Sequence, residues 1–287
     1  MSAERSAEVF ARTLKRLVNR LEVYAAGLVA QLDSKAGDLE LTAANLAMAG
    51  LFRQQLTDEL NRLGFQTAVR TLYSGVADHL EAETPPEDLP LAESMLAAFA
   101  SGITRELDNA WFTLTGRIGE TVEQAILTNA PISELVQGLA APGPEGRESI
   151  RLTADLEAPM SQWVNWASAA VDTAVQALIR KLQAARATAA GVTYFIYTGT
   201  TIDSTRPFCR LMRDVVVTLA DLRSIDTDPA NAELRRLRGR QPSTVTTLGG
   251  FRCRHRLVAT SEAGARREGL TFFAEARAEL NRRAAAL

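Results

Sequence analysis

The sequence predicts a mainly α-helical protein with a small α+β module towards its C-terminal end. Apolar residues recur every three or four positions from the start of the chain to about residue 188, which is the spacing of amphipathic helices. After residue 190, short runs rich in β-branched and aromatic residues replace that spacing, as is typical of strands. We therefore expect long N-terminal helices packed as a bundle, then a short-stranded C-terminal module and a terminal helix.

The composition is that of a globular protein. Hydrophobic residues make up 46% of the 287 residues and charged residues 23%, and the net charge of −2 excludes a strong overall attraction to nucleic acid or anionic membrane. The charged N-terminus does not resemble a signal peptide, and no apolar stretch approaches the roughly 18 residues of a spanning helix. Because the chain has only two cysteines, we expect free thiols in a protein made in the cytoplasm, with no membrane partner.

The first predicted region, residues 1–84, carries three apolar stripes. The first stripe is compatible with a coiled-coil seam or with a long amphipathic helix on a helical core. Thr42 is a plausible N-cap for the second helix, and Gly64 is a plausible end of it. The stripes consist of Phe10, Leu14, Leu17, Leu21, Tyr24 and Leu28, then Phe52, Leu56, Leu60 and Leu63, then Phe65, Val69, Leu72, Val76 and Leu80.

An acidic segment with three prolines, residues 81–93, predicts a linker between this region and a second helical region at residues 85–190. One long helix is expected from Leu91 to Leu107, with a continuation to Val122. A short helix at 132–139, a loop at 141–146 and a helix that carries residues 163–182 are expected to follow.

The predicted α+β module spans residues 191–260, and a C-terminal helical region spans 261–287. Strands are expected at 192–198, 215–217 and 251–258. Thr218 is expected to cap a short helix at 219–223. The polar segment 226–247 is interpreted as a loop with one helical turn near 232–237.

Two segments of the module carry an unusual combination of residues, Asp203-Ser-Thr205-Arg206-Pro207-Phe-Cys209 and Gly249-Gly250-Phe-Arg-Cys253-Arg-His255. Ser204 or Thr205 is expected to cap a helix whose first turn holds Pro207. Asp203 is placed to accept backbone N–H groups or to pair with an arginine. If the second segment is a strand, Cys253 and His255 share one face.

Together with the strand that precedes them, which ends in Tyr197-Thr-Gly199, these segments resemble the phage Mu protein F-like family of minor head proteins. The resemblance covers roughly residues 115–260 and is densest over 194–210 and 249–257. One departure is that Arg213 and Asp214 stand where the family usually has a glycine before its second strand.

The resemblance implies a structural virion protein of a tailed phage or prophage rather than an enzyme. Such proteins act in head assembly in several copies per particle, in the head or neck, and some leave with the DNA. The portal protein, the major capsid protein and packaged DNA are therefore the expected partners, and no cofactor is expected. We expect the helical body to dock on portal or capsid subunits through its apolar stripes.

Three interpretations of Cys209, Cys253 and His255 are open. The first is a polar core in which Asp203, Arg206 and His255 form hydrogen bonds and the thiols pack as small apolar groups. The second is a disulfide between the two cysteines, formed after release from a reducing cell. The third is a zinc site with Asp203 as fourth ligand, although the spacing matches no standard zinc motif.

Two further functional hypotheses follow from single features. A toxin-like hydrolase would use Cys209 as a nucleophile, with a pKa lowered by Arg206, Arg210 and the helix N-terminus, and His255 as its base. A DNA-binding internal or ejected protein would contact phosphates through the basic run between residues 235 and 256. This run comprises Arg235, Arg236, Arg238, Arg240, Arg252, Arg254 and Arg256.

Overall fold

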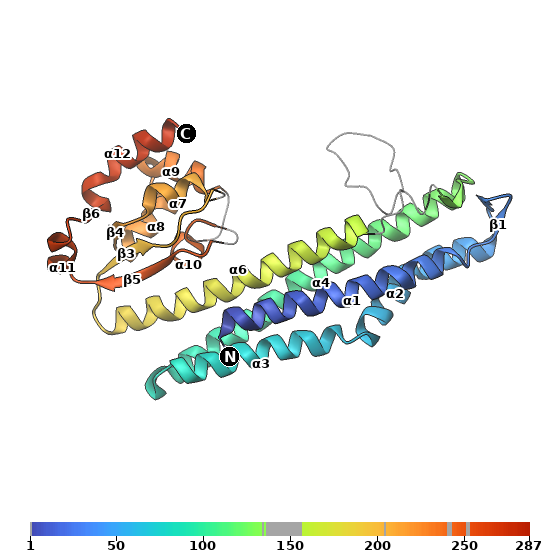
Figure 1. Ribbon diagram of the computed structural model, residues 1–287, viewed down its shortest axis with the longest axis horizontal. Helices are drawn as coiled ribbons and strands as arrows, with labels where there is room; N and C mark the ends of the chain where they lie inside the picture. Colours follow the sequence, from blue (N-terminus) through green and yellow to red (C-terminus); the bar gives the residue numbers. More distant parts are fainter. Residues whose placement is uncertain (1, 134, 136–156, 204, 240–242, 251–252) are drawn as a thin grey trace. The chain divides into compact units, whose positions relative to one another are not determined.

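The computed structural model describes residues 2–133, 135, 157–203, 205–239, 243–250 and 253–287. Its elements confirm the predicted fold class of long N-terminal helices, a small sheet module and a terminal helix (Figure 1). The chain forms two compact units. Unit 1 comprises residues 1–79 and 100–168, and unit 2 comprises residues 80–99 and 169–287. Most of the helix expected at 132–139, and the whole loop expected at 141–146, lie outside the described residues.

Unit 1 is helical. It contains α1 (Ala3–Val29), α2 (Ala43–Arg62), most of α3 (Phe65–Glu83), the C-terminal part of α4 (Leu89–Leu127) and the start of α6 (Glu157–Ala189). The Thr42 side chain accepts a hydrogen bond from the backbone N–H of Asn45, which confirms the predicted N-cap of α2. Gly64, with φ of 105°, separates α2 from α3, in a conformation that glycine adopts without a Cβ clash.

A small hairpin joins α1 to α2 and was not predicted. Its strands β1 (Ser34–Lys35) and β2 (Asp38–Leu39) pair antiparallel. Ala36 and Gly37 have φ of 56° and 94°, as a two-residue hairpin turn requires. The buried side chain of Asn45 accepts from the N–H of Asp33 and donates to two carbonyls, so that it fastens the hairpin to the start of α2.

Most residues of the predicted apolar stripes are buried in unit 1, although Leu63 is half-buried and Leu80 belongs to unit 2. Of the first stripe, Tyr24 is half-buried and the other five residues are buried. Trp163 contacts Trp111, with ring centroids 5.0 Å apart, and Phe65, at 6.1 Å. Trp111 donates a hydrogen bond to Thr57 on α2. Most residues of the stripes are buried within the chain, so these stripes are not the surface expected to dock on a partner.

The acidic, proline-containing segment forms a short connection in unit 2. Helix α3 ends at Glu83, the 3₁₀ helix η1 spans Pro86–Asp88, and α4 begins directly afterwards. Arg186 on α6 donates to the Glu83 carbonyl at 2.8 Å and pairs with Asp88 at 3.6 Å. This turn is thus held against α6 by hydrogen bonding and charge.

Unit 2 contains a four-stranded sheet in the order β5-β3-β4-β6. Strand β3 (Tyr194–Thr198) pairs antiparallel with β4 (Val215–Val217) and β5 (Arg256–Thr260), and β4 pairs parallel with β6 (Thr271–Phe272). The strand predictions at 192–198 and 215–217 are confirmed. The strand predicted at 251–258 is shifted, because its pairing begins only at Arg256. Strand β6 was not predicted, since two residues are too short to show the alternation of a strand.

Helices cover both faces of this sheet. Helices α7 (Pro207–Met212), α9 (Ala232–Arg238) and α12 (Phe273–Ala285) pack with one another, and α11 (Glu262–Arg267) places Ala265 against Val216 and Phe272 on the opposite face. Residues 261–287 thus supply a strand and two helices to unit 2 rather than a single terminal helix.

The segment 218–247 is more helical than predicted. Thr218 caps α8 (Leu219–Thr227) through a reciprocal capping box with Asp221, so the predicted cap is correct and the helix is longer than expected. Helix α9 confirms the helical turn predicted near 232–237. The 3₁₀ helix η2 (Pro229–Asn231) and the short helix α10 (Thr244–Thr247) replace further parts of the predicted loop. Among the described helices, none has the length and apolar character needed to cross a bilayer.

Candidate functional site

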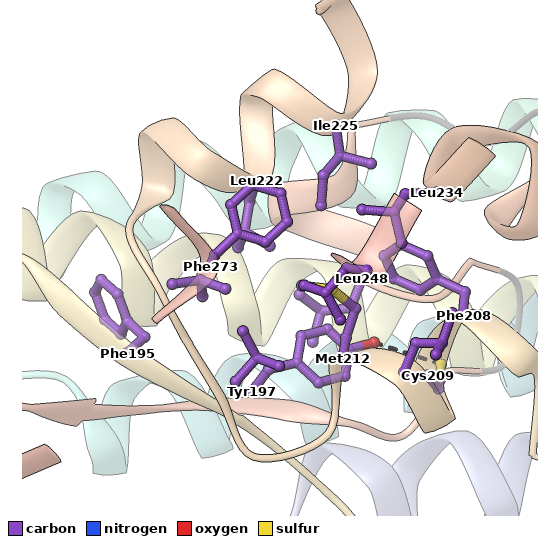
Figure 2. Packing of buried hydrophobic residues seen from close by; sticks show 14 of the residues in the cluster. Phe195, Tyr197, Phe208, Cys209, Met212, Leu222, Ile225, Leu234, Leu248 and Phe273 are labelled. Carbon is purple, nitrogen blue, oxygen red and sulfur yellow. Dashed lines mark hydrogen bonds between the residues drawn. The ribbon is translucent and has the colours of Figure 1, made fainter. Parts of the chain in front are cut away.

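The two motif segments meet in the core of unit 2. The sulfur atoms of Cys209 and Cys253 lie 3.8 Å apart, and Nδ1 of His255 lies 3.7 Å from the sulfur of Cys253. The Tyr197 hydroxyl lies 3.4 Å from the sulfur of Cys209 (Figure 2) and 3.9 Å from the sulfur of Cys253. All four side chains are buried. These two thiols, the imidazole and the phenol are called the Cys-His cluster below.

Local sequence explains how β3 and α7 place their members of the Cys-His cluster. Alternation along β3 buries Phe195 and Tyr197 on one face of the sheet. Pro207 occupies the first turn of α7, where its missing N–H costs nothing. The buried face of α7 then carries Phe208 and Cys209, and the Phe208 ring meets the Tyr197 ring edge-on at 6.3 Å.

Cys253 and His255 point to the same core, although not because they lie in a strand. They precede β5, and the predicted strand through these residues is wrong. The alternation survives, with Cys253 and His255 buried and Arg254 and Arg256 exposed. An extended backbone segment alternates its side chains whether or not it pairs with a neighbour.

Two glycines allow the chain to approach the cluster closely. A Cβ on Gly249 would lie 2.0 Å from the sulfur of Cys209, and a Cβ on Gly199 would lie 2.6 Å from the His255 ring. The N–H of Gly249 donates to the sulfur of Cys253 at 3.3 Å. Gly250 has φ of 97°, which favours glycine on backbone grounds. The Gly-Gly pair of the motif is therefore needed for space at one position and for backbone conformation at the next.

Arg180 on α6 completes the surroundings of the cluster and was not predicted. Its guanidinium donates to the carbonyl oxygens of Thr246, Cys253 and His255. Arg180 is buried within α6, although it lies two positions from Leu178 and Leu182 and therefore off the apolar stripe predicted for this helix. Arg206 makes an analogous contact from the other side, donating to the Gly249 carbonyl at 2.7 Å.

The pKa values of the two thiols are shifted in opposite directions. The hydrogen bond with Cys253, followed by burial, raises the pKa of Cys209. The hydrogen bond from Cys209 is also the main reason that the pKa of Cys253 is lowered, and His255 and Arg180 contribute further. The shared hydrogen bond thus favours a single thiolate in the pair, on Cys253, which also contacts His255.

Asp203 and Thr205 lie outside the cluster, which contradicts two expectations. Asp203 is exposed, and Arg210 donates to its backbone carbonyl. The Thr205 hydroxyl accepts from the N–H of Ile202, and Arg206 is the N-cap residue of α7, without a side-chain cap. Ser204 lies outside the described residues. Asp203 is therefore neither a member of a polar core nor a fourth metal ligand.

The predicted hydrogen-bonded core is only partly present. Arg206 and the cysteines occupy the expected region, but Nε2 of His255 is buried with no hydrogen-bond partner among the described residues. Buried imidazoles normally satisfy both nitrogens. Both cysteines are free thiols here. At 3%, 7% and 6% exposure, Cys209, Cys253 and His255 do not present a surface to a large substrate.

The turn after α7 accommodates the departure from the family pattern. Asp214 has φ of 64° and donates its N–H to the carbonyl of Tyr197 at 2.8 Å. Aspartate is among the non-glycine residues most often found in this left-handed region. Asp214 thus takes a conformation for which the usual glycine is suited.

The arginine run is largely engaged within unit 2. Arg238 has a side-chain exposure of 1% and pairs with Asp226 at 3.0 Å, so its expected contact with phosphate is wrong. Arg235 donates to the carbonyl of Asp226, and Arg236 donates to Glu233 and to the Ala284 carbonyl.

The rest of the run offers fewer exposed arginines than the sequence suggests. Arg254 and Arg256 are exposed, and Arg254 lies 3.9 Å from Asp172. Arg240 and Arg252 lie outside the described residues. Of the described members of the run, Arg236, Arg254 and Arg256 are exposed, and Arg235 and Arg236 also bind acceptors within the protein.

No protein-family model, curated protein or solved structure matches this chain. Functional inference therefore rests on the site. Its buried pair of thiols and an imidazole can pack, bind a metal ion or form a disulfide, whereas acyl transfer would also need access for a substrate.

Proposed function

We propose that the protein is a structural minor head protein of a tailed phage or prophage, associated with the portal or the capsid. The observation that carries the proposal is the convergence of the resemblance motif. Tyr197, Cys209, Gly249, Cys253 and His255 come from three separated segments and meet in one buried cluster. A motif of this kind specifies how a module folds, as expected if the family shares an assembly domain rather than a catalytic centre.

The burial of the cluster supports a structural role over a hydrolytic one. A nucleophilic thiol needs a base within reach and an open approach for the scissile bond. Here the imidazole faces Cys253 rather than Cys209, and both sulfurs are buried. A role in assembly requires neither.

Exposed apolar side chains of unit 1 are the proposed contacts with portal or capsid subunits. Phe112 on α4 is 61% exposed and Leu51 on α2 is 49% exposed. Leu51 and Phe112 are therefore the positions at which cross-linking probes test these contacts.

The test is photo-cross-linking in intact particles made by the source phage. A photoreactive amino acid replaces Leu51 in one sample and Phe112 in another, and a matched control carries it at Gln54, an exposed polar position of α2. We expect particle-bound protein and cross-links from Leu51 or Phe112 to the portal or major capsid protein, with weaker cross-links from Gln54. Recovery of the chain only as particle-free protein would overturn the proposal.

A further inference from the structure

We propose that Cys209, Cys253 and His255 bind a zinc ion, with the hydroxyl of Tyr197 at the fourth position. These three residues, all buried, bring their ligand atoms within 4.8 Å of one another. The inference is independent of the proposed role in phage heads, because it rests on the chemistry of the Cys-His cluster alone.

Two distances between donor atoms match the edges of a tetrahedral zinc site. Zinc–sulfur bonds of about 2.3 Å and zinc–nitrogen bonds of about 2.05 Å give tetrahedral edges of about 3.8 Å between two sulfurs and about 3.6 Å between sulfur and nitrogen. The sulfurs of Cys209 and Cys253 are 3.8 Å apart, and the sulfur of Cys253 is 3.7 Å from Nδ1 of His255. Two edges of the tetrahedron are therefore present without any rearrangement of the side chains.

The hydroxyl of Tyr197 lies at the distance expected between two ligands from both sulfurs, which makes it the candidate for the fourth position. Its distances of 3.4 Å and 3.9 Å from the two sulfurs bracket the edge of about 3.5 Å that a zinc–oxygen bond of about 2.0 Å would give. The Tyr197 and His255 rings also contact each other, with centroids 5.4 Å apart. Asp203, the ligand suggested by the sequence, is exposed and plays no part.

The donors favour zinc over the other common divalent ions. Thiolates and imidazole suit zinc, whereas magnesium and calcium prefer oxygen ligands. The four donors leave no position for a substrate, which is typical of structural zinc sites. A dication also offsets the charge of two buried thiolates, which are costly without a partner. The N–H of Gly249 already donates to the sulfur of Cys253 and orients it.

The ion would join three segments of unit 2. Tyr197 belongs to β3, Cys209 to α7, and Cys253 and His255 to the segment before β5. Metal binding then contributes to the folding free energy, because the unfolded chain has no assembled site. Only Cys253 and His255 are close in sequence, whereas many zinc motifs use two such pairs of ligands. Here the other two ligands come from distant positions, Tyr197 and Cys209.

The test uses the full-length chain, kept reduced and purified after expression with added zinc. Elemental analysis is expected to find about one zinc ion per chain. Replacement by Co²⁺ is expected to give the visible bands of tetrahedral cobalt and a thiolate-to-cobalt charge-transfer band. Cys209→Ser, Cys253→Ser and His255→Gln are each expected to weaken zinc binding at least about tenfold, and Met212→Leu, in the same core but without a donor, is expected to bind normally.

Measurements on the wild-type chain test the zinc site even if a variant fails to fold. Chelation of zinc is expected to lower the melting temperature, and its restoration is expected to reverse the loss. Tyr197→Phe is expected to keep the charge-transfer band and to change the d–d bands, as water replaces the phenol. Folded, reduced wild-type protein without bound zinc and without cobalt bands would overturn the proposal. An unchanged Tyr197→Phe spectrum would remove Tyr197 from the ligand set.

Discussion

The sulfur atoms of Cys209 and Cys253 lie 3.8 Å apart, although 44 positions separate the two residues in the chain. This contact joins helix α7 to the segment that precedes β5. Gly249 leaves room for the sulfur of Cys209, and the rings of Tyr197 and Phe208 pack against each other beside it.

Substitution of Gly249 by alanine is expected to destabilise the protein by about 1–3 kcal/mol, which is the usual cost of forcing a methyl group into a packed core. The new Cβ would lie 2.0 Å from the sulfur of Cys209. Thermal unfolding followed by circular dichroism measures the effect. Gly50→Ala is the matched control, because a Cβ there meets nothing within 4 Å and alanine favours the helix. Equal melting temperatures for both variants would contradict the packing argument.

Removal of the Arg180 guanidinium is expected to be more damaging than removal of a neighbouring charge. Arg180→Met leaves the carbonyls of Thr246, Cys253 and His255 without their charged donor. Unsatisfied buried acceptors predict a loss of about 3 kcal/mol in the free energy of unfolding. Lys181→Met, at the adjacent exposed position, is expected to change it by less than about 0.5 kcal/mol. Denaturant titration of both variants tests this difference.

Asp226 neutralises the buried Arg238 and also accepts two hydrogen bonds from Thr244. Asp226→Asn is expected to cost about 3–5 kcal/mol, because it leaves a buried guanidinium without a counter-charge. Glu279→Gln is the control, since the Glu279–Arg282 pair is exposed and such pairs contribute less than about 1 kcal/mol. A small effect of Asp226→Asn in chemical unfolding would refute the assignment of Arg238 to the core.

The carboxyl of Asp228 is expected to add an acid-sensitive contribution to stability. The N–H of Ala230, and next the guanidinium of Arg277, lower the pKa of Asp228 from its ordinary value of 3.8. Since the folded pKa is depressed, this stability is fully present above about pH 4 and is lost as the pH falls through the folded pKa.

The measurement is the melting temperature of wild type and Asp228→Asn as a function of pH. The difference between them is expected to be largest near neutral pH and to shrink below pH 4. Arg277→Leu is expected to raise the pKa of Asp228 in an NMR titration without returning it fully to 3.8, because the contact with Ala230 remains. A difference that stays constant with pH would contradict the assignment.

The local features of the fold were predictable because each depends on residues close together in sequence. Thr42 and Thr218 cap helices through N–H groups three positions ahead. The buried stripe from Phe10 to Leu28 and the strands β3 and β4 follow from periodicity and residue type. The sequence also predicted that most of those side chains are buried, but it did not predict which surface they pack against.

The sequence by itself determined the helical body, the short-stranded module and the residues of its unusual motif, since spacing, caps and strand propensity act over a few positions. Only the tertiary structure decided that Arg180 supports the Cys-His cluster, that Asp203 lies outside it, and that Arg238 is buried with Asp226. It also supplied β6, whose two residues form a strand through pairing with β4. Each of these outcomes depends on contacts between distant segments, and the energy of such contacts is not encoded in any local pattern.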